Sequence, residues 1–263
     1  MSDRPTRGRY LAAARDLLDR LEDQSDAIER VSRVCADAIG GGNLVHLFGT
    51  GHSRIPVEEM FPRYGSFPGF HPIVELSLTY HTQVVGANGQ RQAMFIERVE
   101  GLAERILANF TLDPSDVMIV FSASGLTAVP VEIAQLSRER GLTVVAVTSV
   151  AQSTAGTPTH SSGTRLVDHA DIVLDLGTPP GDAMVQLEGL ATPVGPGSSL
   201  AAIALVNEIK VQTAQLLVER GAMPPVLTSP SLVGADESAR LFDAAYAEYG
   251  ERVARLLRRP SAD

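Results

Sequence analysis

Residues 117–127 read VMIVFSASGLT, and residues 44–53 read LVHLFGTGHS. Each stretch opens with a short, continuous apolar run, which is typical of a strand buried on both faces of a parallel sheet. Each then passes through glycine and small hydroxyl residues into the start of a helix, where free backbone N–H groups and the helix dipole attract anions. The hydroxyls add hydrogen-bond donors without adding charge, so the two loops together predict a cradle for a phosphate group.

The order of the remaining elements predicts one α/β domain over residues 1–263. Apolar, β-rich runs predict strands at 44–48, 72–76, 117–121, 143–148 and 171–176. Helical periodicity predicts helices at 10–38, 56–61, 91–110, from the second hydroxyl loop to Arg140, 198–217 and 236–257, with loops at 149–164 and 177–197. Strands alternating with helices indicate a doubly wound parallel sheet, with an N-terminal helix (1–40) and a C-terminal helix (232–263) added to it.

Composition excludes several classes of partner. The chain of 263 residues is 44% hydrophobic and 20% charged, which is ordinary globular usage, and its formal net charge is −9. That charge argues against binding to nucleic acid or to an anionic membrane, since either needs a basic patch. No apolar run approaches the ~20 residues of a membrane span, and no apolar signal core follows the basic residues 1–9. We therefore expect a cytoplasmic protein, with the lone Cys35 packed in a core.

Four segments resemble the SIS (sugar isomerase) domain over roughly residues 30–220. They are GTGHS at 49–53, EEMFPRYG at 58–65, SASGLT at 122–127 and GSS at 197–199. The resemblance implies a flavodoxin-like sandwich that binds a phosphosugar at the carboxyl ends of its strands. The phosphate would then contact residues of the two hydroxyl loops, namely Gly51, Ser53, Ser122, Ser124, Gly125 and Thr127.

The resemblance also favours Glu59 as the catalytic base, with His52 or Glu208 assisting at the ring oxygens. Glu58 and Glu59 lie ~100° apart on one helix, so one of them faces the site and the other is solvated. Glu208 interrupts an otherwise apolar helix, and Glu188 lies in a segment that could form a hairpin reaching the site. Glu58, Glu188 and Glu208 therefore remain alternatives for the base.

Departures from the family's branches bear on the chemistry. The phosphoheptose isomerases that the 58–65 segment resembles use a metal, with a histidine one helical turn before the second glutamate. Here that position is Ile55, and the six histidines show no metal-ligand spacing, so we expect neither a metal nor another cofactor. The glucosamine-6-phosphate synthases, which share this fold, use a lysine near the chain end, whereas the one lysine here is Lys210. The N-acetylmuramate-6-phosphate etherase branch uses a glutamate base without a metal.

Three functions are compatible with such a site: a phosphosugar lyase, a phosphosugar isomerase and a non-catalytic phosphosugar sensor. A carboxylate near C2 can remove the proton next to the C1 carbonyl of an opened sugar phosphate, after which either isomerisation or loss of the C3 substituent follows. An N-acetyl group at C2 blocks ordinary isomerisation, which favours elimination on an amino sugar such as N-acetylglucosamine 6-phosphate. A non-catalytic phosphosugar sensor would use the same loops.

The sequence also leaves open a dinucleotide site, and it predicts an oligomeric state. A dinucleotide site after the first strand would place Glu75 on the ribose, but Arg54 replaces the third glycine of that motif. The long N-terminal helix and the apolar segment 198–217 predict a homodimer or a dimer of dimers.

Overall fold

Five parallel strands form the centre of the molecule in the order β2-β1-β3-β4-β5. We describe the computed structural model over residues 7–79 and 89–257. The strands are β1 (Val45–Gly49), β2 (Phe70–Ile73), β3 (Val117–Phe121), β4 (Thr143–Thr148) and β5 (Ile172–Asp175). The order 2-1-3-4-5 is that of flavodoxin-like doubly wound folds, so the predicted fold class is confirmed.

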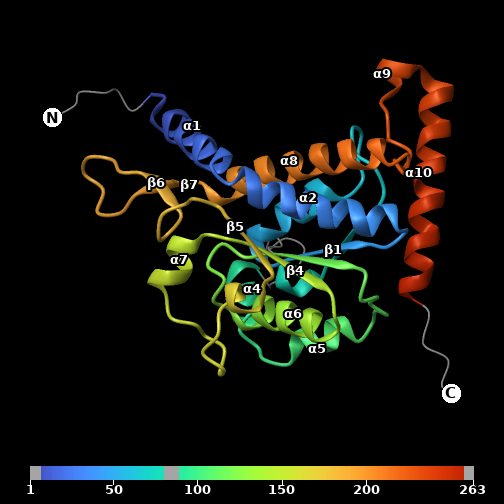
Figure 1. Ribbon diagram of the computed structural model, residues 1–263. Coiled ribbons are helices and arrows are strands. Elements are labelled where there is room, and N and C mark those ends of the chain that lie inside the picture. The colour runs from blue at the N-terminus through green and yellow to red at the C-terminus, as the bar shows by residue number, and fades with distance from the viewer. Residues whose placement is uncertain (1–6, 80–88, 258–263) are drawn as a thin grey trace.

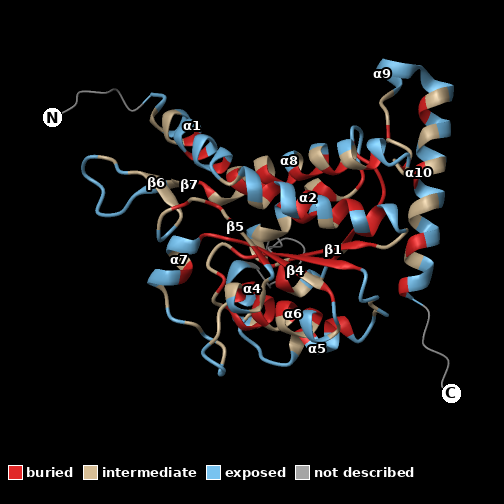
Figure 2. Ribbon diagram, in the orientation of Figure 1, coloured by how far each residue is buried: buried red, intermediate tan, exposed pale blue. Residues whose placement is uncertain are grey.

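Helices cover both faces of this sheet (Figure 1). One face packs on α1 (Arg9–Glu22), α2 (Ser25–Gly40), α3 (Ile55–Met60) and α8 (Ser198–Glu219). The other packs on α5 (Leu102–Leu107) and α6 (Ala128–Glu139), with α4 (Gly89–Ile96) on the same side. Side chains alternate along each strand, so that Val117 and Ile119 enter the first core while Met118 and Val120 enter the second. The strands are accordingly buried along their length (Figure 2).

Five predicted elements differ in detail. The strand expected at 72–76 lies earlier, at Phe70–Ile73, so the two ranges share only two residues. The helix expected at 10–38 is two helices, because the Gln24 side chain leaves the helical path to bond the backbone of Asp175 on the edge strand β5, at 2.7 Å in both directions. The helix expected at 91–110 is two short helices, α4 and α5, separated by a turn at 97–101, and Gly101 with φ +83° precedes the first residue of α5. The loop at 149–164 contains α7 (Val150–Ala155), which starts where the Ser149 hydroxyl accepts the Gln152 N–H.

The excursion at 177–197 contains an antiparallel hairpin of β6 (Ala183–Val185) and β7 (Val194–Pro196). At the chain end, α9 (Pro230–Val233) precedes α10 (Ala235–Leu256), which runs beside the amino ends of the strands (Figure 1). Residues 1–6, 80–88, which include His81, and 258–263 lie outside the described residues.

Helix α8 is long and apolar enough to cross a membrane by length and composition alone. In the fold it packs against α2, α3 and α1 and contributes buried residues such as Leu205 and Ile209 to the first core. Helices of this kind are common in the interiors of globular domains.

A buried polar network joins α10 to the amino ends of β1, β2 and β3. His46 Nε2 lies 3.0 Å from Asp116 Oδ2, and His71 Nδ1 lies 2.8 Å from the Tyr249 hydroxyl on α10. The two imidazole rings meet edge to face with their centroids 5.5 Å apart. Burial lowers the pKa of His71 to about 4, helped by the neighbouring His46. The folded protein therefore holds His71 neutral.

This network predicts a loss of stability in mild acid. Unfolded His71 takes up a proton near its ordinary pKa of 6.5, whereas folded His71 stays neutral down to about 4. The contribution of His71 is thus fully present above pH 6.5 and is lost as the pH falls through that interval, by about 3 kcal/mol. Urea unfolding of His71→Asn between pH 4 and 7 should show a shallower pH slope than the wild type. The same slope in both proteins would contradict the assignment, and His52→Asn, at the other end of the sheet, serves as control.

Candidate functional site

The two hydroxyl loops lie side by side at the carboxyl ends of β1 and β3. These strands pair in parallel with Gly49 opposite Phe121, so the residues that follow both strands emerge at the same edge of the sheet. His52 and Ser53 from the first loop and Ser122 from the second line one small cavity. Ser198 and Ser199, at the start of α8, line it too. The structure thus brings together three segments that are far apart in the sequence.

This cavity is small, with a volume of about 10 Å³, roughly the room for one water molecule. Its apolar wall consists of Pro56, Phe121, Val147, Leu176 and Ala202. Ser124 and Thr127 belong to the same loop as Ser122 but do not line the cavity.

Two glycines allow the loops to turn so tightly. A Cβ at Gly49 would lie 2.2 Å from the carbonyl oxygen of Ser53, so the first loop folds directly back on its own start. Gly125 has φ +63°, and a Cβ there would lie 2.9 Å from Thr148 Oγ1. Its N–H donates to Ser122 Oγ at 3.1 Å, which fixes the second loop while leaving the hydroxyl hydrogen of Ser122 to donate elsewhere.

The start of α6 offers hydroxyls more than backbone groups to an anion. Thr127 is the N-cap and makes no side-chain capping bond. The N–H of Val129 already donates to the Glu97 carbonyl at 3.0 Å, and Pro130 has no N–H. An anion at this helix start would therefore depend strongly on Ser122, Ser124 and Thr127.

Glu59 lies on α3, one helical turn beyond the cavity residue Pro56. Its Oε2 is 2.8 Å from an Arg63 nitrogen, and its Oε1 is 3.3 Å from the Asn207 amide on α8. Lys210, the one lysine of the chain, is buried beside it and donates to the Glu59 carbonyl at 3.0 Å. Burial acts to raise the pKa of Glu59, but the hydrogen bonds and positive charges outweigh it and hold that pKa below its ordinary value. Glu59 is therefore an ionised, half-buried carboxylate.

These surroundings do not fit a metal at Glu59. Both carboxylate oxygens already take partners, and the preceding turn presents Ile55 where the resemblance to phosphoheptose isomerases implies a histidine. Within residues 7–79 and 89–257, no group of three or more histidine, cysteine or acidic side chains is arranged to hold a metal ion.

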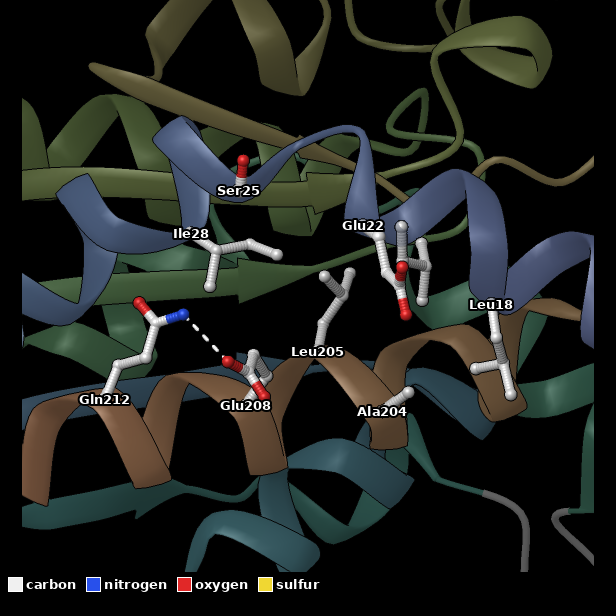
Figure 3. Close-up of a pocket in the computed structure, with 9 residues that line it drawn as sticks. Leu18, Glu22, Ser25, Ile28, Ala204, Leu205, Glu208 and Gln212 are labelled. Atoms are coloured by element: carbon white, nitrogen blue, oxygen red, sulfur yellow. Dashed lines mark hydrogen bonds between the residues drawn. The ribbon is translucent and has the colours of Figure 1, made fainter.

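The other candidates for the base lie elsewhere. Glu58 is exposed and pairs with Arg54 at 2.6 Å. Glu188 is exposed in the connection between β6 and β7. Glu208 lines a groove of about 490 Å³ between α8 and the α1–α2 pair, where it accepts a hydrogen bond from Gln212 at 2.8 Å (Figure 3). That groove is larger than the loop cavity, but Leu18, Leu21, Ile28 and Leu205 make it mostly apolar.

Glu97 is a candidate that sequence reasoning missed. Its Oε2 accepts a hydrogen bond from the Thr50 hydroxyl in the first glycine loop at 2.8 Å, while its backbone carbonyl holds the first turn of α6. Burial raises the pKa of Glu97 against the opposing effects of the Thr50 bond and the charge of Arg98. Glu97 thus contacts the first loop and the first turn of α6, and it keeps its proton to a higher pH than an exposed carboxyl does. Its spacing within 91–110 gave no signal beyond that of a solvated helix face.

Similarity to solved structures supports the fold. The structure of a phosphoheptose isomerase from Francisella tularensis covers 78% of this chain and 95% of that chain, with a TM-score of 0.50 and 14% identity. That likeness concerns the arrangement of the elements.

Similarity in sequence establishes the family. A UPF0309 protein of Streptomyces coelicolor is 36% identical over 257 residues, which cover 96% of this chain and 98% of that protein. A UPF0309 protein of Listeria monocytogenes is 32% identical over 234 residues, or 89% and 91% of the two chains. The family model described as "SIS domain" matches residues 9–149, which include both hydroxyl loops and Glu59. The chain belongs to the SIS domain family.

Proposed function

We propose that this protein is a phosphosugar lyase that acts on an amino-sugar 6-phosphate such as N-acetylglucosamine 6-phosphate. The observation that carries the proposal is the convergence of the two hydroxyl loops and the start of α8 on one cavity. Membership of the SIS family supports phosphosugars as the ligand class. An aldose–ketose isomerase and a non-catalytic phosphosugar sensor are the alternatives, and the experiments below separate them.

The phosphate takes the hydroxyls of Ser53, Ser122, Ser124 and Thr127, together with backbone N–H groups next to Gly51 and Gly125. Neutral donors hold the phosphate without binding it so tightly that product release fails. The binding energy gained at this end of the sugar is used to orient the reacting end.

Two half-buried carboxyls supply the proton transfers: Glu59 on α3, the helix that follows the first loop, and Glu97, which bonds Thr50 in that loop. Their environments shift their pKa values in opposite directions, down for Glu59 and up for Glu97. Such a divergence suits a base and an acid working as a pair. Glu59, ionised, takes the proton from C2 of the opened sugar. The C3–O bond then breaks with its electron pair on oxygen, and Glu97 protonates that oxygen, so that water leaves and a C2=C3 double bond remains. His52 assists at a ring oxygen, and Glu208 drops to a second choice because it faces the other groove.

The same proposal covers the assembly and the setting of the protein. The groove beside α8 and the exposed apolar side chains Leu18, Val211 and Val218 support a homodimer or a dimer of dimers. The net charge of −9 supports a protein that binds neither nucleic acid nor an anionic membrane. A cytoplasmic location is part of the same proposal.

The phosphate cradle is tested by removing single hydroxyls. Ser124→Ala or Thr127→Ala should weaken the binding of N-acetylglucosamine 6-phosphate by about 1–3 kcal/mol, because a phosphate oxygen loses its donor. Calorimetry measures the dissociation constants, with Ser115→Ala, exposed at the opposite end of β3, as control. Affinities equal to that of the wild type in both cradle variants would rule the assignment out.

The acid and the base are separated by deuterium exchange. Glu59→Gln should lower turnover at least ~100-fold and also stop exchange of the C2 hydrogen in deuterated water, because no base remains. Glu97→Gln should stop formation of the unsaturated product while C2 exchange continues. Mass spectrometry follows both, and Glu58→Gln is the matched control on the same helix.

Three results would change the proposed assignment of the base or the proposed lyase activity. Full activity of Glu59→Gln transfers the role of base to Glu97 or Glu208. A ketose product without dehydration establishes the isomerase. If no hexose or amino-sugar phosphate that binds shows either C2 exchange or a product, the protein is a non-catalytic phosphosugar sensor.

The proposed mechanism also predicts that activity survives metal removal. Exhaustive chelation followed by dialysis should leave turnover unchanged, because Glu59 is held by Arg63 and Asn207 and Ile55 offers no ligand. Loss of turnover that zinc restores and magnesium does not would demonstrate a metal site and disprove this part of the mechanism.

A further inference from the structure

The carboxylate of Asp182 caps the amino end of α8 by accepting hydrogen bonds there. Its Oδ1 accepts the Ser198 N–H at 2.8 Å and the Gly197 N–H at 3.3 Å, and its Oδ2 accepts the Ser198 hydroxyl at 2.6 Å. The backbone of Asp182 has φ +66°, and among the described residues it is the one non-glycine residue with a positive φ. Aspartate tolerates this left-handed conformation better than most residues, and here the conformation accompanies the contact with α8.

The position of this carboxylate bears on ligand binding because Ser198 also lines the loop cavity. Ser198 at the start of α8 lines that cavity, and so does Ser122, the first residue of the loop that leads to α6. Both helix starts carry a positive dipole end. At α8 the dipole is already matched by a fixed negative charge, whereas the Thr127 side chain makes no capping bond at α6. A second anion near Ser198 would meet the charge of Asp182 at close range. The α6 end is therefore the favourable place for a phosphate.

The hydrogen bonds of the two serines have opposite polarity. A serine hydroxyl has one hydrogen to donate and two lone pairs to accept with. Ser198 gives its hydrogen to Asp182, so it offers a ligand only lone pairs. Ser122 accepts from the Gly125 N–H and keeps its hydrogen available. Ser198 thus suits a ligand hydroxyl or N–H, while Ser122 suits a phosphate oxygen.

We propose that Asp182 is a positioning residue that sets the direction in which a phosphosugar binds. By holding Ser198 as an acceptor and by repelling anions from α8, it places the phosphate at the α6 loop and a sugar hydroxyl or amide at Ser198. The inference rests on the proposed function, since it assumes a phosphosugar in this cavity. It adds that the site discriminates against ligands that are anionic at both ends, such as sugar bisphosphates.

The test is Asp182→Asn, which keeps the shape of the side chain and tolerates the left-handed backbone. The asparagine oxygen can still accept the Ser198 N–H, but its amide donates to the Ser198 hydroxyl and turns that hydroxyl toward donation. Calorimetry at constant ionic strength measures inorganic phosphate and N-acetylglucosamine 6-phosphate. Inorganic phosphate should bind about three- to tenfold more tightly than to the wild type, as expected when a charge is removed from a helix start. The sugar phosphate should bind more weakly.

Two further variants separate positioning from mere support of the fold. Ser198→Ala should weaken the sugar phosphate and leave inorganic phosphate unchanged, because it removes the acceptor and not the phosphate cradle. Asp236→Asn, in the first turn of the equally long helix α10, should change neither, and circular dichroism checks that all variants fold.

Equal affinities in Asp182→Asn and the wild type would overturn the inference, as would the same fold-change for both ligands. If the wild type binds inorganic phosphate and Ser124→Ala does not, the cradle stands whatever Asp182 does. If neither the wild type nor Asp182→Asn binds phosphate or sugar phosphate, the proposed function and this inference both fall.

Discussion

The parallel pairing of β1 with β3 is the constraint on which the site depends. With Gly49 opposite Phe121, the chain leaves both strands at the same level, so Thr50 to Ser53 and Ser122 to Thr127 emerge side by side. The strand order places these two at the point where the chain winds outward in both directions, which is where ligands bind in open α/β sheets. The tight turn at Gly49 then directs the first loop back over the sheet edge instead of away from it.

Neighbouring groups give the two half-buried carboxyls, Glu59 and Glu97, different characters. Glu59 is surrounded by the positive groups of Arg63 and Lys210, so desolvation is outweighed and the carboxylate stays ionised. Glu97 has one neutral donor in Thr50, and desolvation prevails. Their neighbours thus shift the pKa values of two glutamates in opposite directions, which is the divergence that the proposed pairing of a base with an acid requires.

The sequence predicts the sheet and the loops well because both are local. An apolar run of five residues, such as 117–121, can only be a buried strand or part of a buried helix, and the glycine and hydroxyl residues after it remove the second choice. The roles of Glu97 and Asp182 depend on partners 47 and 16 residues away, Thr50 and Ser198. The periodicity of a sequence carries no information about contacts between residues so far apart in the chain. The break at Gln24 has the same origin, because its partner Asp175 is 151 residues further on.

The proposed function asks an acidic chain to hold an anion, and the charge of that anion is then met mainly by dipoles. Arg54 and Arg63, the basic residues nearest the first loop in the chain, are each paired with a glutamate, and Lys210 is buried against Glu59. The second loop therefore offers an anion only hydroxyls and N–H groups, whose electrostatic attraction acts over a shorter range than that of a full charge. Recognition by such groups requires the phosphate to lie within hydrogen-bond distance, so it depends on shape and on loop closure more than on long-range attraction.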